Sequence, residues 1–378
     1  MGYQLRKDTV VDSPDNINVY IYLIPTFMKK ILSIDGGGIR GIIPGMFLVA
    51  LEEKLKKESG NPDAAIVDYF DFFAGTSTGG ILTCLLLCPS KDHPTRPMFS
   101  ARAALDLYLE HGNEIFKMSF FKRLRAKFGL AGERYNSLIF ENVLKHYFED
   151  TRLSQLIKPC IVSAYNIELR KTHFFRQQNA ISRGDSRDFY LKDVCRATSA
   201  APTYFSVAEI YSLAGVRYPL LDGGVFATNP ALSGLIEVTK AYKQTRINDI
   251  YLFSLGTGQS KRSYDYEHFK KSSAMAIVPA MLDIMMSGVA ETSHFFLQQL
   301  FRSAGKDKNY IRIEPASLES IKEGLDAASP SNIQKLVSLG DRTVSEHENT
   351  LNEIAKFLVE EHKRINYKLP WDFLKANK

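Results

Sequence analysis

A short strand, a glycine-flanked serine and an apolar helix follow one another within residues 69–87, and this order constrains the fold more than any other stretch. The aromatic run 69–74 predicts a buried strand, and the apolar run 80–87 predicts a buried helix. Between them, residues 75–79 fit the Gly-x-Ser-x-Gly form of a nucleophile elbow. Such a turn presents Ser77 at a helix N-terminus, where free N–H groups and the helix dipole favour developing negative charge. The pattern predicts a serine acyl-transfer enzyme.

Composition excludes several other classes of protein. The chain has 378 residues, of which 45% are hydrophobic, so it can form one large domain or two medium ones. It contains no apolar run long enough for a transmembrane helix. The net charge of +6 is too diffuse to indicate nucleic acid but suits an anionic membrane surface. The four cysteines are scattered, so we expect them to be buried core residues in a reducing compartment: Cys84, Cys88, Cys160 and Cys195. Because their spacing is not that of a metal site, we expect neither a metal nor a cofactor.

The first residues do not have the pattern of a secretory signal. The apolar segment 19–24 is short, follows acidic residues and lacks a small-residue cleavage site, so we expect a cytoplasmic protein. We expect residues 1–27 to be an N-terminal extension and residues 28–378 to be a single domain. Within that domain, we expect a core over about 31–260 and a helical C-terminal part over 261–378.

Predicted strands and helices alternate along the chain. This alternation predicts a three-layer α/β sandwich, with a mainly parallel central sheet flanked by helices. Besides the elbow strand and helix, the expected strands are 31–34, 161–165, 173–175 and 250–255, and the expected helices are about 44–60, 101–118, 137–149, 193–201 and 345–366.

A glycine-rich loop, residues 35–41, follows the first predicted strand. Three of its glycines have the spacing of a dinucleotide-binding fingerprint, but no acidic residue is well placed at the end of the next strand. The other interpretation is an oxyanion hole, in which the N–H groups of Gly36, Gly37 and Gly38 point at an oxyanion beside Ser77. We favour the oxyanion hole and keep a nucleotide-binding enzyme as the alternative.

A serine hydroxyl needs a base. None of the eight histidines follows a strand on a recognisable turn, whereas Asp222 follows an apolar run and precedes two glycines. Such a carboxylate is uncrowded and can reach a hydroxyl, but it must be desolvated to be basic enough near neutral pH. The alternative is a turn aspartate that caps its own backbone. In the glycine-rich loop, Arg40 fits a lipid phosphate and a structural carboxylate equally well.

These motifs together resemble the patatin-like phospholipases over most of the chain. The segments 35–41, 75–79 and 222–224 resemble the family's oxyanion, nucleophile and dyad-aspartate motifs, and the segments 197–205 and 254–258 resemble its supporting segments. The resemblance implies a Ser-Asp dyad that works without a histidine or a metal.

The roles of the site residues follow from the resemblance. It implies that Ser77 attacks a fatty acyl ester of a membrane phospholipid, that Asp222 accepts the proton, and that the loop glycines hold the oxyanion. Water would then release the fatty acid, as in a phospholipase A. A storage or binding protein with vestigial esterase activity is a further alternative.

Two segments bear on membrane contact and regulation. Residues 117–134 carry six basic residues and three phenylalanines, so they fit either an interfacial segment beside anionic head groups or a solvated helix whose phenylalanines join the core. The Met-rich helix 274–301 fits either core packing, which we favour, or a lid or acyl-chain wall. Some bacterial members of the family are membrane-degrading antiviral effectors switched on by cyclic nucleotides. A peripheral membrane protein with such an activator is therefore an open hypothesis, and the sequence leaves the oligomeric state undetermined.

Overall fold

A single eight-stranded sheet organises the molecule. The computed structural model describes residues 3–4, 24–25, 28–115, 137–258, 263–315, 317–318, 321–322 and 324–367. The strands of the sheet are β3 (Lys29–Ile34), β4 (Phe72–Thr76), β5 (Cys160–Asn166), β6 (Lys171–Arg176), β7 (Ala208–Tyr211), β8 (Arg217–Asp222), β9 (Ile250–Leu255) and β10 (Tyr310–Ile313). Their order is β10-β9-β3-β4-β5-β8-β7, and β6 also pairs with β5. The first five strands in this order run parallel, and β6, β7 and β8 join antiparallel.

The helices follow the strands in the alternating order expected from the sequence. They are α1 (Ile42–Ser59), α2 (Ile66–Tyr69), α3 (Thr78–Leu87), α4 (Ala101–Ile115), α6 (Ser137–Phe148), α7 (Gln177–Arg183), α8 (Leu191–Thr198), α9 (Gly224–Ala227), α10 (Ala231–Ala241), α11 (Tyr266–Lys271), α12 (Ala274–Ser303), α13 (Pro330–Glu346) and α14 (Glu348–Tyr367). Short 3-10 turns lie at Gly38–Gly41, Leu153–Gln155, Gly184–Ser186, Ile247–Asp249 and Asp307–Asn309. A separate pair of two-residue strands is formed by β1 (Tyr3–Gln4) and β2 (Ile24–Pro25).

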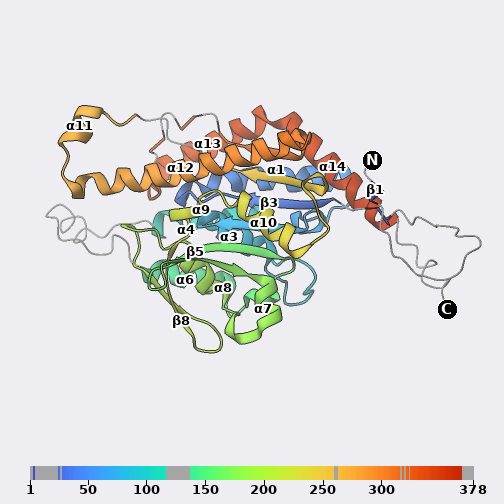
Figure 1. Ribbon diagram of the computed structural model, residues 1–378, viewed down its shortest axis with the longest axis horizontal. Helices are drawn as coiled ribbons and strands as arrows, with labels where there is room; N and C mark the ends of the chain where they lie inside the picture. The colour runs from blue at the N-terminus through green and yellow to red at the C-terminus, as the bar shows by residue number, and fades with distance from the viewer. Residues whose placement is uncertain are drawn as a thin grey trace, which may run out of the picture.

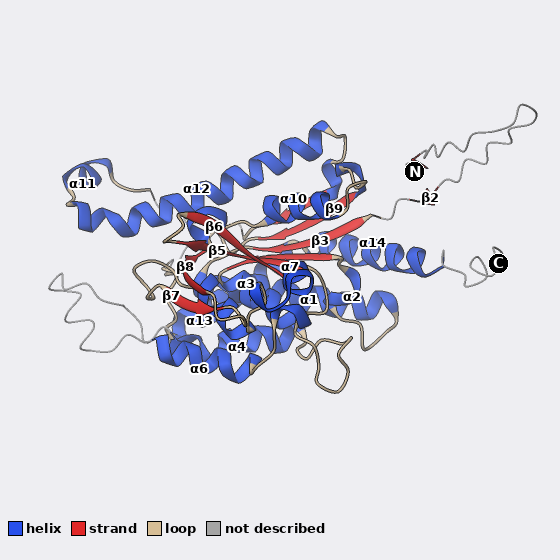
Figure 2. Cartoon of the chain, turned by 60° about the horizontal axis from the view of Figure 1, so that its bottom comes forward, coloured by secondary structure: helices blue, strands red, loops and turns tan. Residues whose placement is uncertain are grey.

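The alternating side chains of the central strands divide the core into two layers. In β3, Leu32 and Ile34 join the larger cluster with α1, α3, α4, α13 and α14, whereas Ile31 joins the smaller cluster with α10 and α12. Because both faces of the sheet are covered, its central strands are almost continuously apolar. Figures 1 and 2 show helices on both sides of the sheet. The expected three-layer α/β sandwich with a mainly parallel sheet is confirmed.

Element boundaries differ from the expected ones in a few places. The elbow strand begins at Phe72, because Tyr69 already belongs to α2. The segment 261–378 is not wholly helical, since it supplies β10, which pairs with β9 at the sheet edge. The expected helix 345–366 begins at Glu348 and is preceded by α13.

The structure also bears on the expectations for the cysteines, for two segments of the chain and for membrane-spanning helices. All four cysteines are free and buried, as expected. The basic segment 117–134 and most of residues 1–27 lie outside the described residues. The division into an extension and one domain stays a prediction. Among the helices of the described residues, none is both long and apolar enough to cross a membrane.

Candidate active site

The turn between β4 and α3 holds Ser77 in a conformation that non-glycine residues rarely adopt. Its φ is 52° and its ψ is −122°. The Ser77 N–H donates to Thr198 Oγ1 at 2.9 Å, and the Thr198 hydroxyl donates to the Ser163 carbonyl at 2.7 Å. A Cβ on Gly79 would lie 2.1 Å from the Ile34 carbonyl oxygen, so the turn needs glycine there. Ser77 is thereby fixed between two strands at the start of a helix.

Strand register brings Asp222 to Ser77. The N-terminal part of β5 pairs with β4, which places Thr76 opposite Ser163. The next residue of β5, Ala164, pairs with Asp222 at the end of the antiparallel strand β8. The C-terminal ends of β4 and β8 therefore face each other beside β5. As a result, the side chain of Ser77 lies beside the carboxyl of Asp222 and influences its pKa, although 145 residues of sequence separate them (222 − 77).

The environment of Asp222 makes its carboxyl unusually basic. The residue is only 2% exposed, and burial raises the pKa of its carboxyl to about 7. The hydrogen bond from the Gly224 N–H, at 2.7 Å to Oδ1, opposes that rise in pKa, and so does the neighbouring Ser77 side chain. The desolvation expected of a carboxylate base is present, and so is the turn interaction with its own backbone. The two interpretations of Asp222 are therefore compatible.

The glycine-rich loop passes directly against the elbow. A Cβ on Gly36 would lie 3.2 Å from Ser77 Cβ. The Gly36 N–H already donates to the Thr228 carbonyl at 2.9 Å, so it is not free for an oxyanion in this conformation. Among the described residues, the N–H groups of Gly37 and Gly38 have no such partner. This narrows the expected set of three oxyanion donors to two.

Both of the remaining loop glycines are required by close packing. A Cβ on Gly37 would lie 2.3 Å from Thr257 Oγ1. Gly38 has a φ of +59°, and a Cβ there would lie 2.2 Å from the Leu325 carbonyl oxygen. Farther along the loop, a Cβ on Gly41 would lie 2.0 Å from Thr78 Oγ1. Close contacts within the chain explain why these positions are glycine. The spacing of a dinucleotide-binding fingerprint is therefore explained without a bound dinucleotide.

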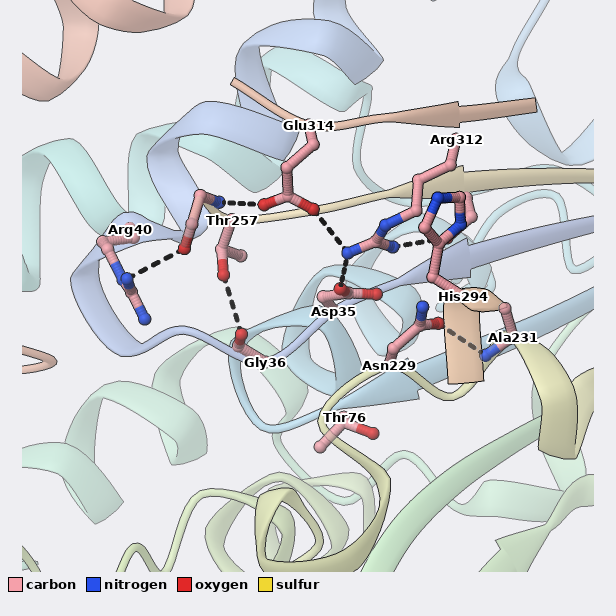
Figure 3. A network of polar contacts seen from close by, with 12 residues as sticks. Asp35, Gly36, Arg40, Thr76, Asn229, Ala231, Thr257, His294, Arg312 and Glu314 are labelled. Carbon is pink, nitrogen blue, oxygen red and sulfur yellow. Dashed lines mark hydrogen bonds and ion pairs between the residues drawn. The ribbon is translucent and has the colours of Figure 1, made fainter. Parts of the chain in front are cut away.

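A buried charged network supports the loop from the β10 side. The Arg312 guanidinium bonds Asp35 at 2.7 Å and also pairs with Glu314, and both Arg312 and Asp35 are almost fully buried (Figure 3). Burial raises the pKa of Asp35, and Arg312 lowers it. Glu314 in turn accepts a hydrogen bond from the Gly258 N–H at 2.7 Å. The network therefore ties β10 to the start of the glycine-rich loop.

Arg40 binds backbone carbonyl groups in this loop region. Its Nε donates to the Gly37 carbonyl at 3.3 Å and its Nη1 to the Gly258 carbonyl at 2.9 Å. The side chain also lines the main cavity of the site. Arg40 thus has a structural role in the loop and still lies where an anionic group could approach it.

Two cavities meet at the Ser77–Asp222 pair. The larger, of about 980 Å³, is lined by Asp222, Arg40 and part of α12. The smaller, of about 40 Å³, is lined by Ser77 and an almost wholly apolar set of side chains that includes Ile81, Leu107, Tyr108, Ile115, Phe140 and Phe205. Met286 of α12 lines both cavities. A large cavity with charged groups on its wall and a small apolar slot therefore lie beside the Ser77–Asp222 pair.

The histidines whose side chains the structure describes do not contribute to this site. In the described part of the chain, no histidine lines either cavity. His173 packs among aromatic rings such as Phe175, and burial lowers its pKa to about 4. His294 shares a hydrogen bond of 2.9 Å with the Tyr310 hydroxyl. Among the residues described, no group of three or more His, Cys, Asp or Glu could hold a metal ion.

Sequence reasoning included Thr198 only within the supporting segment 197–205 and missed Ser163 and Arg312, which also support the site. Ser163 and Thr198 lie behind the elbow, and Arg312 lies behind the loop. One signal was available, because a hydroxyl inside the apolar strand 161–165 needs a hydrogen-bond partner. The partner of Arg312 lies 277 residues away, and no local pattern points to it.

Comparisons with known proteins agree with this geometry. The profile of the family described as Patatin-like phospholipase matches residues 32–235. The chain is 30% identical to Patatin-2-Kuras 3 of Solanum tuberosum, over 89% of this chain and 91% of that protein. It is 31% identical to Patatin-like protein 1 of Oryza sativa subsp. indica, over 85% and 82% of the two chains. The crystal structure of VipD from Legionella pneumophila, at 12% identity and a TM-score of 0.33 over 84% of this chain and 67% of that one, is too distant to bear on the site. The chain therefore belongs to the patatin-like phospholipase family of lipid acyl hydrolases.

Proposed function

We propose that this protein cleaves fatty acyl esters of membrane phospholipids through an acyl-Ser77 intermediate. The observation that carries the proposal is the position of Ser77 on its strained elbow beside the buried carboxyl of Asp222. A carboxylate in water is too weak a base for a serine hydroxyl. The raised pKa of Asp222 brings its basicity into the range that suits general base catalysis near neutral pH.

The proposed reaction has two halves. In the first, Ser77 Oγ attacks the ester carbonyl while Asp222 takes its proton, and the alcohol leaves with that proton. The N–H groups of Gly37 and Gly38 stabilise the oxyanion, and each such donor contributes about 100- to 1000-fold in rate. In the second half, Asp222 takes a proton from water as the water oxygen attacks the acyl carbon. Asp222 then returns that proton to Ser77 Oγ as the bond between Ser77 and the acyl group breaks and the fatty acid is released.

The two cavities suit the two parts of a phospholipid. The apolar slot beside Ser77 suits the acyl chain that is being cleaved. The larger cavity suits the head group and the rest of the lipid, and Arg40 on its wall is a candidate partner for the phosphate. This assignment is consistent with a phospholipase A.

Ser77→Ala and Asp222→Asn test the mechanism. Both variants should lose release of fatty acid from phospholipid, by about 1000-fold or more, because a nucleophile and its base act as a unit. The assay is mass spectrometry of the lipid products, with circular dichroism to show that each variant is folded. Labelling by a fluorophosphonate probe should occur in the wild type and be absent in Ser77→Ala.

Two results would contradict the proposal. Full activity in Ser77→Ala would remove the nucleophile from the mechanism. Absence of labelling and of hydrolysis in the folded wild type would favour the storage or binding alternative.

A conservative Thr198→Val variant provides a further check. It removes the hydroxyl that accepts the Ser77 N–H, so it should reduce the rate less than Ser77→Ala does.

The finer physiological role stays a prediction from the sequence. A cytoplasmic effector activated by a cyclic nucleotide would release fatty acid faster when the right nucleotide is added. The test is the wild-type rate on phospholipid vesicles with each of a panel of cyclic mono-, di- and trinucleotides. Equal rates throughout would contradict nucleotide activation and leave the hydrolase proposal intact.

A further inference from the structure

The inner face of α12 belongs partly to the core and partly to the main cavity. Leu297 and Phe301 are fully buried in the smaller core cluster, which they share with α10, and Ala290 is nearly fully buried. Toward the helix N-terminus, Met286 lines both cavities and approaches Gly224, close to Asp222. The helix therefore forms a wall of the proposed active site as well as a packing element. The Met-rich helix was expected mainly to pack in the core, and only its C-terminal half does so.

The opposite face of α12 is apolar and exposed. Seven large side chains, each 41–54% exposed, lie on this face: Val278, Met281, Ile284, Met285, Phe295, Phe296 and Leu300. Their spacing places them on one side of a helix of 3.6 residues per turn. These seven residues are called the outer face below. Exposed apolar groups gathered on one side of a helix in this way indicate an interaction site.

The outer face carries almost no charge. Between residues 277 and 300 there is no Lys or Arg, and the only acidic residues are Asp283 and Glu291. Asp283 is turned toward the cavity, where it accepts a hydrogen bond from the Tyr264 hydroxyl at 2.8 Å. A surface that docks a protein partner usually has a polar rim with hydrogen-bonding groups. This face offers Met, Phe, Ile, Leu and Val instead.

The adjoining helix α11 adds groups typical of a membrane interface. Tyr266 is 71% exposed, and the Lys270 ammonium lies over its ring, 5.7 Å from the centroid. Tyrosine and lysine combine an apolar body with a polar tip, so they suit the boundary between lipid and water. Figure 2 shows that α11 and the first turns of α12 extend beyond the end of the sheet. This end of the molecule therefore projects from the described part of the sheet.

We propose that the outer face of α12, together with Tyr266 of α11, docks this protein on a lipid surface. The inference rests on the proposed function, because a phospholipase must draw its substrate from a bilayer. The choice of lipid over a second protein copy comes from the position of the helix. Its inner face lines the cavity that contains Asp222, so docking by its outer face leaves only the thickness of α12 between that cavity and the membrane. An interfacial helix of this kind buries its apolar side between the head groups and the acyl chains.

The test separates lipid binding from catalysis. Full-length protein with Ser77→Ala is sedimented with equimolar phosphatidylcholine and phosphatidylglycerol vesicles, so that the lipid is not consumed. Adding Met281→Glu and Phe296→Glu to the outer face should weaken vesicle binding at least about tenfold. The control carries Ile181→Glu in α7, which also charges an exposed apolar position. In Figure 1, α7 and α12 lie on opposite sides of the molecule. The control should bind vesicles like its parent.

Three further measurements separate docking from misfolding, self-association and loss of catalysis. With Ser77 restored, the outer-face variant should hydrolyse a short soluble ester at the wild-type rate and melt at the wild-type temperature. Vesicle binding equal to that of the control would overturn the proposal. So would a dimer, seen by light scattering, that the outer-face variant disrupts without any change in vesicle binding. Loss of vesicle binding in the variant, combined with no esterase activity in the wild type, would support docking and contradict the proposed function instead.

Discussion

At the scale of single residues, the protonation of Asp222 controls the proposed chemistry. Only the carboxylate form can accept the Ser77 proton. We predict that kcat/KM for a neutral, short-chain ester rises with pH and levels off above about 7, the pKa that burial gives Asp222. The measurement is a pH–rate profile on a soluble substrate, which avoids changes in lipid packing. A flat profile down to about pH 5 would contradict the role of Asp222 as base.

When Asp222 is ionised, it should also lower the free energy of unfolding. The pKa of Asp222 rises from 3.8 to about 7 on folding, so protonation favours the folded state. That contribution is complete at low pH and is lost as the pH rises through about 7. We predict that Asp222→Asn, which stays neutral, is more stable than the wild type near pH 8 by up to about 4 kcal/mol, with the gain vanishing near pH 4. Urea unfolding at several pH values measures the gain, and a pH-independent difference would contradict it.

Local sequence could predict which residues form the site but not how each is used. Ser77 and Asp222 stand on glycine turns after apolar strands, and that chemistry is visible in a few consecutive residues. The hydrogen bond from the Gly36 N–H to Thr228 depends on a segment from elsewhere in the chain. The three adjacent glycines therefore looked equivalent in sequence. Of these three, Gly36 donates its N–H to Thr228, whereas the N–H groups of Gly37 and Gly38 have no backbone partner among the described residues.

At the scale of elements, β10 is held to the sheet centre by charge as well as by its ladder. Arg312 contacts Asp35 at 2.7 Å and donates to Ser254 at 2.8 Å, so it links β10 to β3 and β9. We predict that Arg312→Met costs about 3–5 kcal/mol of unfolding free energy, because it leaves buried carboxylates unpaired. The control is Arg102→Met, which breaks an exposed ion pair with Asp106 and should cost under about 1 kcal/mol. Equal losses in urea unfolding would contradict a special role for the buried network.

Elements were predictable where their pattern is local and strong. The strands β3, β4 and β9 are buried on both faces, so they read as apolar runs between glycines. The edge strand β10 has four residues, and its charged Arg312 hides the pattern. Strand order was not predictable at all, because the pairing of β5 with both β4 and β8 depends on contacts between distant segments. That pairing is what brings Asp222 to Ser77.

At the scale of the whole molecule, the site lies where three separately formed parts converge. The sheet supplies Ser77 and Asp222, and the helices below it, with Phe140 among them, supply the apolar slot. The helix α12 from the other layer closes both cavities through Met286. Met286 is an adaptable side chain, because an unbranched thioether can take several conformations. The division between acyl slot and main cavity therefore depends on one side chain that comes from outside the catalytic elements.

This arrangement predicts how substrate length is selected. The slot beside Ser77 measures only about 40 Å³, little more than the volume of one water molecule, so a long acyl chain must continue past Met286. Met286→Ala should open that path and raise the ratio of kcat/KM for long-chain over short-chain esters by about tenfold, since each extra methylene bound contributes about 1–3 kcal/mol. Met286→Phe should lower the same ratio. The comparison uses soluble esters of graded chain length, so that membrane docking does not enter. A ratio unchanged in both variants would mean that the acyl chain leaves the slot by another route.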